Sequence, residues 1–504
     1  MSHLAIAPLL LPLLVGILLL FMRHLDIRVR RTVSVAAVFG QIGLALLLAG
    51  ALSSGDILVY KLGNWAAPFG IVLVADALAA WMLLVTALLA LFALLYACQG
   101  GDTQGRHFHV LFQLQLFGLN GAFLTGDLFN LFVFFEVLLL ASYGLILHGG
   151  GRARVRAGLH YVVLNLAGSA LFLIAVGTLY GVFGTLNMAD LAVKVAATPA
   201  QEQGLARAAG LLLFTVFALK AALLPLYLWL PAAYANTSAP VAALFAIMTK
   251  VGVYSIIRVY SLVFGAEAGP LAHLIAPWLL PLALATLLVG MLGVLAATGL
   301  RQQATYLVVA SVGSLLTAFA LDSGAGIAAS LYYLPHSTFA AAALFLLADV
   351  IASQRGKHAD SFEPGPAMAR AVLLGGLFFV TAIQVVGLPP LSGFLGKFLL
   401  LRAALEHPAA AGVMAVVLLG GLLGMIALAR SGSLLFFRSM PLAEGESPPP
   451  AAPIAVALIP VVGLLLLGLA MTVFAGPLQV HVTNIAEQLS RPYLYVHAVL
   501  GGRI

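Results

Sequence analysis

Three lysines and one glutamate lie inside long apolar stretches of this chain. Lys220 and Lys250 stand near the middles of adjacent apolar segments within 211–260, and Lys397 and Glu136 interrupt two other apolar runs. A charge at the bilayer centre costs about 2.5–3.5 kcal/mol on insertion scales, so a chain keeps one only where it faces protein, water or a partner. These residues predict a polar pathway inside a membrane. The alternative for the lysines is that their ends snorkel to the headgroups.

Glu136 and Lys220 are predicted to form a coupling pair. Two opposite charges reduce each other's burial penalty, and separating them would release a proton from the lysine or recruit one to the glutamate. Such coupling could drive transport. The alternative is a static ion pair that ties two helices together.

Lys250, His336 and Lys397 are predicted to carry protons onward. The two lysines have no carboxylate at the centre of their own or adjoining segments, and a buried lysine without a counterion can load and unload protons. His336 titrates near neutral pH and could bridge the two halves of the chain. Its alternative is a hydrogen bond to a neighbouring group.

Other chemistry is not indicated. The single cysteine, Cys98, excludes an intrachain disulfide and a cysteine-based metal cluster. His107 and His109 resemble a metal-binding pair, but no acidic or thiol group accompanies them in the sequence, so we expect interfacial histidines. Motifs for a nucleophile, haem, flavin or phosphate loop are missing from the sequence. We therefore predict no catalytic residue, no cofactor and no metal.

Long apolar helices must position these groups. Of the 504 residues, 63% are hydrophobic and 8% are charged, against about 25% charged in soluble proteins. The chain is therefore predicted to be an all-α integral membrane protein. With about 20 apolar residues per span, fourteen segments are predicted, at 4–22, 32–52, 72–97, 108–125, 128–148, 158–183, 208–233, 239–263, 272–298, 303–321, 326–352, 370–405, 408–437 and 452–475.

The basic residues predict the orientation of these segments. Fourteen of the 24 Lys and Arg residues lie on one side, seven on the other, and three within the membrane. Because Lys and Arg concentrate in cytoplasmic loops, both termini are predicted to be periplasmic. The longest cytoplasmic loops are then 353–366 and 439–453. The net charge of +7 is explained by the basic residues of the predicted cytoplasmic loops. It does not imply a nucleic-acid partner.

Prolines interrupt two of the predicted segments. Pro225 and Pro231 lie in the seventh, and Pro389 and Pro390 lie in the twelfth, where freed backbone groups need other partners. The breaks are an odd number of segments apart, which predicts two inverted five-helix repeats, each with a broken helix; chance placement is the alternative. The predicted units are 1–107 (three N-terminal helices), 108–263 (first repeat), 264–437 (second repeat) and 438–504 (last helix and tail).

Two stretches carry a family resemblance. TGDLFNLFVFFEVLLLASYGLI and LKAALLPLYLWLPAAYANTSAPVAALFAIMTKVGVYSIIRV resemble the antiporter-like family, which the proton-pumping membrane subunits of respiratory complex I share with the Mrp (or Pha) multisubunit cation/proton antiporters. The resemblance extends over nearly the full length. Together with GNWAAPFGIVLVAD, the amino-acid sequence of these stretches is most similar to that of the D subunits of the Mrp antiporters.

The resemblance implies roles for the buried charges. Glu136 and Lys220 would be the functional pair, Lys250 the central relay and Lys397 the terminal relay, in a fold of fourteen helices with an inverted repeat. It also implies a transporter subunit of a bacterial inner membrane and not an enzyme. Its partners would be other small and large hydrophobic antiporter subunits, the lipid bilayer, H⁺, and Na⁺ or K⁺.

The chain departs from the family at one position. Many relatives carry a lysine about five residues after the position of His336, where this chain has Ala341. His336 with ordered water would have to connect the two halves. Two other functions stay open on the sequence: a proton-pumping membrane subunit of a complex I-like NADH:quinone oxidoreductase or membrane-bound hydrogenase, and a scaffold with inert charges.

Overall fold

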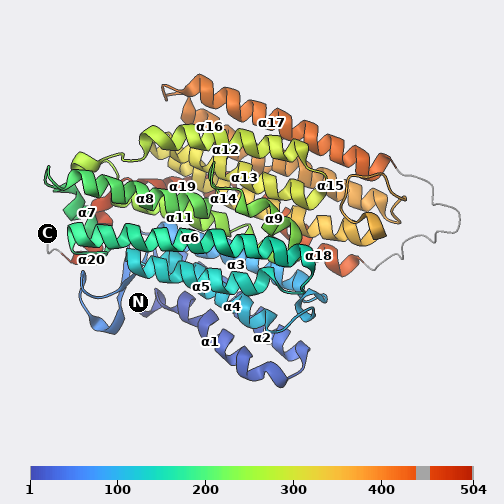
Figure 1. Cartoon of the computed structure of the whole chain (residues 1–504), viewed down its shortest axis with the longest axis horizontal. Coiled ribbons are helices and arrows are strands. Elements are labelled where there is room, and N and C mark those ends of the chain that lie inside the picture. Colours follow the sequence, from blue (N-terminus) through green and yellow to red (C-terminus); the bar gives the residue numbers. More distant parts are fainter. Residues whose placement is uncertain (1, 439–453, 502–504) are drawn as a thin grey trace.

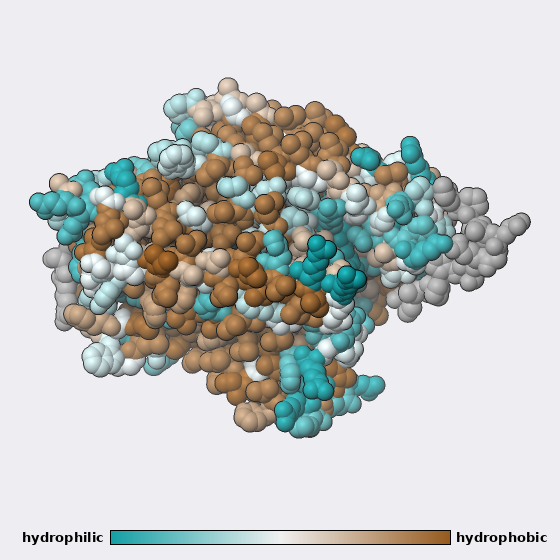
Figure 2. Space-filling model, in the orientation of Figure 1, coloured by the Kyte–Doolittle hydropathy of each residue, from teal (hydrophilic) through white to brown (hydrophobic). Residues whose placement is uncertain are grey.

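The computed structural model, which describes residues 2–438 and 454–501, is a bundle of apolar helices that run roughly side by side (Figure 1). Hydrophobic residues cover the middle of the visible surface, and hydrophilic residues gather towards its ends (Figure 2). Such a belt suits a protein surrounded by lipid. The start of the first helix and the end of the last described helix lie at the same end of the bundle (Figure 1). The predicted loop 439–453 lies outside the described residues.

Every predicted segment contains at least one helix. The first half of the chain holds α1 Ala7–Phe21, α2 Ile27–Ala51, α3 Ala77–Ala97, α4 Phe108–Leu124, α5 Leu128–Ile146, α6 Arg152–Phe183, α7 Met188–Ala196, α8 Gln203–Ala221, α9 Trp229–Asn236, α10 Ala239–Phe245 and α11 Met248–Leu262. The second half holds α12 Ala276–Ala296, α13 Leu300–Phe319, α14 Gly324–Gln354, α15 Ala371–Val386, α16 Ser392–Ala404, α17 Ala410–Gly432, α18 Ala455–Val473, α19 Ala475–Leu489 and α20 Pro492–Leu500.

The membrane class predicted from composition is confirmed. Within the described residues, eleven helical stretches are long and apolar enough to cross a membrane. The chain is a multi-pass membrane protein. Fourteen spans, the inverted repeats and the four predicted units stay predictions.

A small hairpin corrects the expectation of a purely helical chain. Strands β1 Leu58–Lys61 and β2 Val72–Ala75 pair antiparallel, with Leu58 opposite Ala75. The third segment was therefore predicted to become helical too early. Asp76 explains the boundary, because its carboxylate accepts a hydrogen bond of 2.9 Å from the backbone N–H of Ala79 and caps α3.

Both proline-rich segments are interrupted, as predicted. α8 ends at Ala221 and α9 begins at Trp229, whereas α15 ends at Val386 and α16 begins at Ser392. Side chains satisfy the freed backbone groups: the Trp229 indole donates a hydrogen bond of 2.9 Å to the carbonyl of Leu219. These partners allow a helix to stop at membrane depth.

A third break, between α10 and α11, was not predicted. No proline lies at Ala246 or Ile247. The hydroxyl of Tyr234 donates 2.9 Å to the carbonyl of Phe245, and in a continuous helix that carbonyl would accept from the N–H four residues later. The break places Lys250 in the first turn of α11.

Glycine lets α8 and α11 touch through their backbones. A Cβ atom on Gly252 of α11 would lie 2.4 Å from the backbone N of Ala221 and 2.8 Å from the carbonyl carbon of Lys220. No larger residue fits there without moving a helix. The contact fixes the N-terminal part of α11 against the last turn of α8.

Candidate functional site

Lys220 is held by polar groups of α6. Its side chain is only 4% exposed, and its Nζ donates to the carbonyl of Asn165 (3.2 Å), to Asn165 Oδ1 (3.4 Å) and to Ser169 Oγ (3.5 Å). Gly168 leaves room for the neighbouring Leu219, since a Cβ there would lie 2.4 Å from Leu219 Cδ2. The last turn of α8 also presents the negative end of its helix dipole, which stabilises an ammonium.

Glu136 does not touch Lys220, and the predicted coupling of the two residues stays a prediction. No ion pair within 4.0 Å joins them in the part of the chain that the structure describes, although Glu136 acts on Lys220 through longer-range Coulomb attraction. Glu136 is half-buried in α5, and its Oε1 has no hydrogen-bond partner. The Tyr143 hydroxyl, two turns later, is also buried and unpartnered. Orphaned buried polar atoms of this kind are positions for ordered water.

Lys250 is fully buried and bonded to a single hydroxyl. Its side chain is 0% exposed, and its Nζ donates a hydrogen bond of 3.0 Å to Ser311 Oγ of α13. The Ser311 hydroxyl in turn donates a hydrogen bond of 2.7 Å to the carbonyl of Val308. Hydroxyls both donate and accept, so Ser311 can pass a proton onward from the lysine.

A small cavity continues from Ser311 to His336. Its volume is about 20 Å³, enough for one water molecule. Ser311, Tyr333, His336 and Ser337 give it polar walls, and Ala341 is among its apolar lining residues. A water needs two to four polar partners, which these side chains supply. The position where the sequence predicted a gap is therefore hollow and partly polar.

His336 lies between the two remaining lysines. Its side chain is 1% exposed, its Nδ1 is 3.0 Å from Ser392 Oγ at the start of α16, and both Lys250 and Lys397 act on it electrostatically. Lys397 is half-buried, and its Nζ donates a hydrogen bond of 2.6 Å to the carbonyl of Val386. The break in the twelfth segment leaves this carbonyl without a partner inside its helix. The structure therefore places His336 within electrostatic reach of both lysines, with Lys250 and His336 buried and Lys397 half-buried.

Glycines permit the close approach at this second break. A Cβ on Gly393 would lie 2.8 Å from His336 Cε1 and 2.1 Å from the carbonyl oxygen of Gln384. Gly387 ends α15 in the left-handed region, with φ of 81°, and its Cβ would meet Lys397 Cδ at 3.0 Å. Side chains at these two positions would separate the histidine from the lysine.

From the sequence, Ser311 is only one of several residues that could hold water, with Thr305, Ser314 and Tyr333, and the other hydroxyl and amide groups that connect the charges were not predicted. Asn165 and Ser169 stand four residues apart in an apolar run, so helical spacing could have placed them on one face. Ser311 and Ser392 carry no such signal, because their partners come from distant helices. Gln384 is also buried, and both of its side-chain amide atoms lack a partner, which marks a further place for water near the second break.

Arg258 is buried in α11. Its guanidinium binds Asp76 in a bidentate ion pair, with N–O distances of 2.6 and 2.7 Å. The rings of Tyr254 and Tyr495 lie 5.6 and 5.3 Å from its central carbon. Bidentate geometry and aromatic stacking are what make arginine suited to a buried ion pair. The pair joins the start of α3 to α11 and α20.

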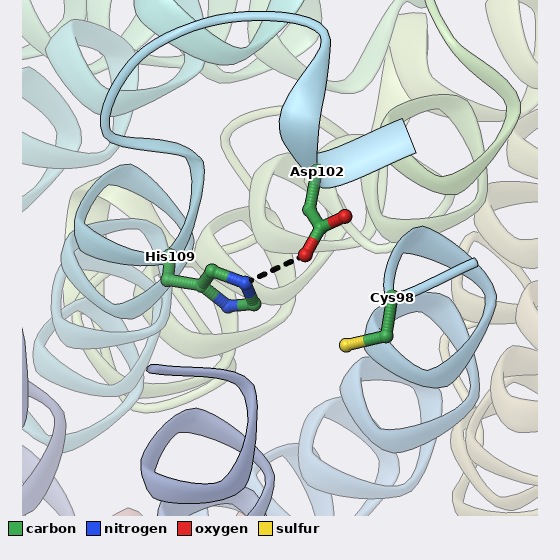
Figure 3. Close-up of side chains that lie close together, drawn as sticks. All are labelled: Cys98, Asp102 and His109. Carbon is green, nitrogen blue, oxygen red and sulfur yellow. Dashed lines mark hydrogen bonds and ion pairs between the residues drawn. The ribbon is translucent and has the colours of Figure 1, made fainter. Parts of the chain in front are cut away.

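Cys98, Asp102 and His109 gather at the opposite end of α3 (Figure 3). Their possible ligand atoms all lie within 4.8 Å of one another. The expectation that no acidic or thiol group accompanies the histidines is therefore wrong for His109, because the turn after α3 folds back on α4. Cys98 caps α3, and Asp102 belongs to a short 3₁₀ turn, Gly101–Thr103.

This cluster has the hydrogen bonds of an ion-pair network. Asp102 accepts two bonds from Arg31, of 2.6 and 2.7 Å, and lies 3.0 Å from His109 Nε2. Burial opposes its ionisation, but the hydrogen bonds from Arg31 and His109 hold the pKa of Asp102 at about 2, whereas burial raises the pKa of the Cys98 thiol to about 11. A metal ion would have to displace Arg31 and deprotonate the thiol. The absence of a metal stays a prediction.

Broken apolar helices around a buried line of lysines define a class of polytopic membrane proteins that carry ionisable groups at mid-membrane. Residues 125–424 match the family described as NADH:quinone oxidoreductase/Mrp antiporter, transmembrane. The chain belongs to this family, and the family resemblance noted in the sequence is confirmed.

Curated relatives match over the whole length. The chain is 42% identical to the D subunit of a probable K(+)/H(+) antiporter from Rhizobium meliloti, covering 99% of this chain and 98% of the relative. It is 38% identical to the D subunit of the Na(+)/H(+) antiporter from Bacillus subtilis, covering 99% and 100%.

Solved structures share the fold. A chain of the Mrp complex from Dietzia superposes with a TM-score of 0.86 at 29% identity, covering 99% of both chains. A chain of respiratory complex I from Thermus thermophilus superposes with a TM-score of 0.79 at 25% identity, covering 97% of this chain and 99% of that one.

Proposed function

We propose that this chain is the proton-translocating D subunit of a multisubunit Na⁺/H⁺ or K⁺/H⁺ antiporter. The observation that carries the proposal is the buried line from Lys250 through Ser311, the small cavity, His336 and Ser392 to Lys397. Full-length similarity to antiporter D subunits supports it. The chain then acts as a transporter component and not as an enzyme.

Protons move along this line by exchange between neighbouring groups. Lys250 releases a proton to Ser311, the water in the cavity passes it to His336, and Ser392 leads on to the terminal lysine, Lys397. A hydroxyl or a water relays a proton because it accepts one while donating another. His336 can take either ring tautomer, which allows it to receive on one nitrogen and donate from the other.

Glu136 and Lys220 couple this line to the second ion. The lysine keeps its hydrogen bonds to α6 while the unpartnered carboxylate is free to bind a proton or a water. A change of charge at Glu136 alters the attraction on Lys220, whose helix end touches α11 at Gly252. The cation crosses largely in a partner protein of the complex.

The assembly is a set of hydrophobic subunits in a bacterial inner membrane, with both termini of this chain in the periplasm. The alternative, a membrane subunit of a redox-driven proton pump, shares the fold, as the similarity to complex I shows. The full-length relatives named as antiporter subunits favour the antiporter. Copurifying partners distinguish them: small hydrophobic subunits indicate the antiporter, and iron–sulfur or flavin proteins indicate the oxidoreductase.

Exchange in membrane vesicles tests the proposal. Glu136→Ala and Lys220→Ala are expected to abolish Na⁺- or K⁺-dependent recovery of a pH-sensitive dye while the complex still assembles. Lys194→Ala is the matched control, because Lys194 forms a partly exposed pair with Asp190 away from the line. Normal exchange in both pathway variants would mean that these charges are inert, as in the scaffold alternative.

A further inference from the structure

A basic pocket opens beside the α1–α2 turn, separate from the proton line. Its volume is about 460 Å³, and the ends of α1 and α2, the turn before α4 and the first residues of α4 enclose it. Three guanidinium groups line it, those of Arg23, Arg30 and Arg106, together with His24 and His107. The α1–α2 pair lies at one edge of the bundle (Figure 1). Hydrophilic residues are visible at the end of that edge, next to an apolar surface (Figure 2).

The positive charges of this pocket are not neutralised by the protein. Within residues 2–438 and 454–501, no carboxylate lies within 4.0 Å of Arg23, Arg30 or Arg106. The one acidic lining residue, Asp102, already binds Arg31 and His109 through its two oxygens. The Nε of Arg30 is buried and has no hydrogen-bond partner. Such a donor calls for an acceptor from outside the chain.

The first turn of α4 adds backbone donors to the same pocket. Phe108, His109 and Val110 are its first three residues, and all three line the cavity. His107 precedes them in the left-handed region, with φ of 62°, and no side chain caps the helix. Free N–H groups and the positive end of a helix dipole favour an anion, and a phosphate above all.

The surroundings select a lipid over a free anion. α1 and the turn after it carry exposed apolar side chains up to the mouth of the pocket, with Leu18, Phe21 and Leu25 exposed by 48%, 78% and 49%. An occupant with acyl chains would cover this face while its phosphate enters the basic cavity. The predicted topology places the pocket on the cytoplasmic side, where basic pockets between helices bind acidic headgroups.

We propose that this pocket binds the phosphate of an anionic phospholipid headgroup. Arg30 and Arg106 hold the phosphate oxygens from α2 and from the turn before α4, and the first turn of α4 supplies backbone donors. The bound lipid fastens the α1–α2 pair to the start of α4. This site does not depend on the proposed transport function.

Binding of short-chain lipids to the full chain, purified in a neutral detergent, tests the proposal. The probes are dioctanoyl phosphatidylglycerol, dioctanoyl phosphatidylcholine and inorganic phosphate, followed by native mass spectrometry and by the shift in thermal midpoint. Arg30→Gln and Arg106→Gln are expected to weaken phosphatidylglycerol binding about tenfold each, as expected for loss of one charge-assisted contact. Arg28→Gln is the matched control, because Arg28 is exposed on the same helix end but does not line the pocket.

Three results would overturn the proposal. Unchanged phosphatidylglycerol binding in both variants would mean that the pocket is not the site. Equal binding of phosphatidylcholine would remove the charge selectivity. Protection by inorganic phosphate equal to that by phosphatidylglycerol would make it a free-anion site. Arg106 lies in an exposed turn, so its variant keeps the test decisive even where Arg30→Gln fails to fold.

Discussion

Filling the small cavity beside Ala341 should stop proton transfer without removing any titratable group. Ala341 lines the cavity between Ser311 and His336 and is 5% exposed. Ala341→Val adds two methyl groups to a space of about 20 Å³, which holds about one water molecule. The methyl groups and the water cannot share that volume. The variant therefore removes the relay between the serine and the histidine.

The size of the effect follows from the missing step. Losing the water should slow exchange at least about tenfold, which equals about 1.4 kcal/mol of activation free energy. Overpacking costs typically about 1–3 kcal/mol of stability, so the complex should still assemble. Exchange is measured by dye recovery in vesicles after Na⁺ or K⁺ is added, at matched amounts of chain.

Ala341→Ser is the control for this variant. It adds a single oxygen that can itself donate and accept, so exchange should stay within about threefold of the wild type, a difference below one kcal/mol. Wild-type exchange in Ala341→Val would refute the reasoning, since protons would then cross without water in this cavity. An equal loss in both variants would point to packing and not to the water.

Three further perturbations have defined outcomes. Gly393→Ala should abolish exchange, because the added Cβ would meet His336 Cε1 at 2.8 Å and push the second break apart; vesicle assays check this. Asp76→Asn should destabilise the protein by about 3–5 kcal/mol in thermal unfolding, because it leaves the buried charge of Arg258 unpaired. Asp102→Asn should cost about 1–3 kcal/mol at pH 7. Since the folded pKa of about 2 is below the unfolded value of about 3.9, that difference is present above pH 4 and lost as the pH falls towards 2.

Each of these outcomes can fail on its own. Normal exchange in the Gly393 variant would show that the histidine does not need its place beside the break. A wild-type unfolding midpoint for Asp76→Asn would mean that Arg258 finds another partner or reaches water. An equal gap between Asp102→Asn and the wild type at pH 7 and pH 3 would show that the carboxylate does not titrate as its hydrogen bonds require.

Local signals made much of the fold predictable. Apolar runs of spanning length located the helices, and Pro225 and Pro389 located two breaks, because proline acts on its own backbone. The break before Lys250 could not be predicted, because its cause is a hydroxyl from Tyr234 in another helix. The hairpin was not predicted, because Val72 and its neighbours are as apolar as the first residues of a membrane-spanning helix.

The site was predictable in its charges but not in its contacts. Burial penalties alone singled out Lys220, Lys250 and Lys397. That Lys220 binds Asn165 of α6 and does not touch Glu136 depends on how α5, α6 and α8 pack, which no spacing along the chain records. Ser311 pairs with a lysine 61 residues away, and one serine among many has no mark of its own.

The backbone contact at Gly252 has a mechanical consequence. With no side chain between them, the backbone of the last turn of α8 and that of the N-terminal part of α11 are in direct contact. α8 stops at Ala221, and α11 starts at Met248 after its own break, so a helix break lies next to each side of the contact. A shift of the helix end that carries Lys220 would therefore press on the backbone two residues after Lys250, which holds the bond to Ser311. The two lysines are thus connected through the backbone contact of their helices, even though no hydrogen bond joins their side chains.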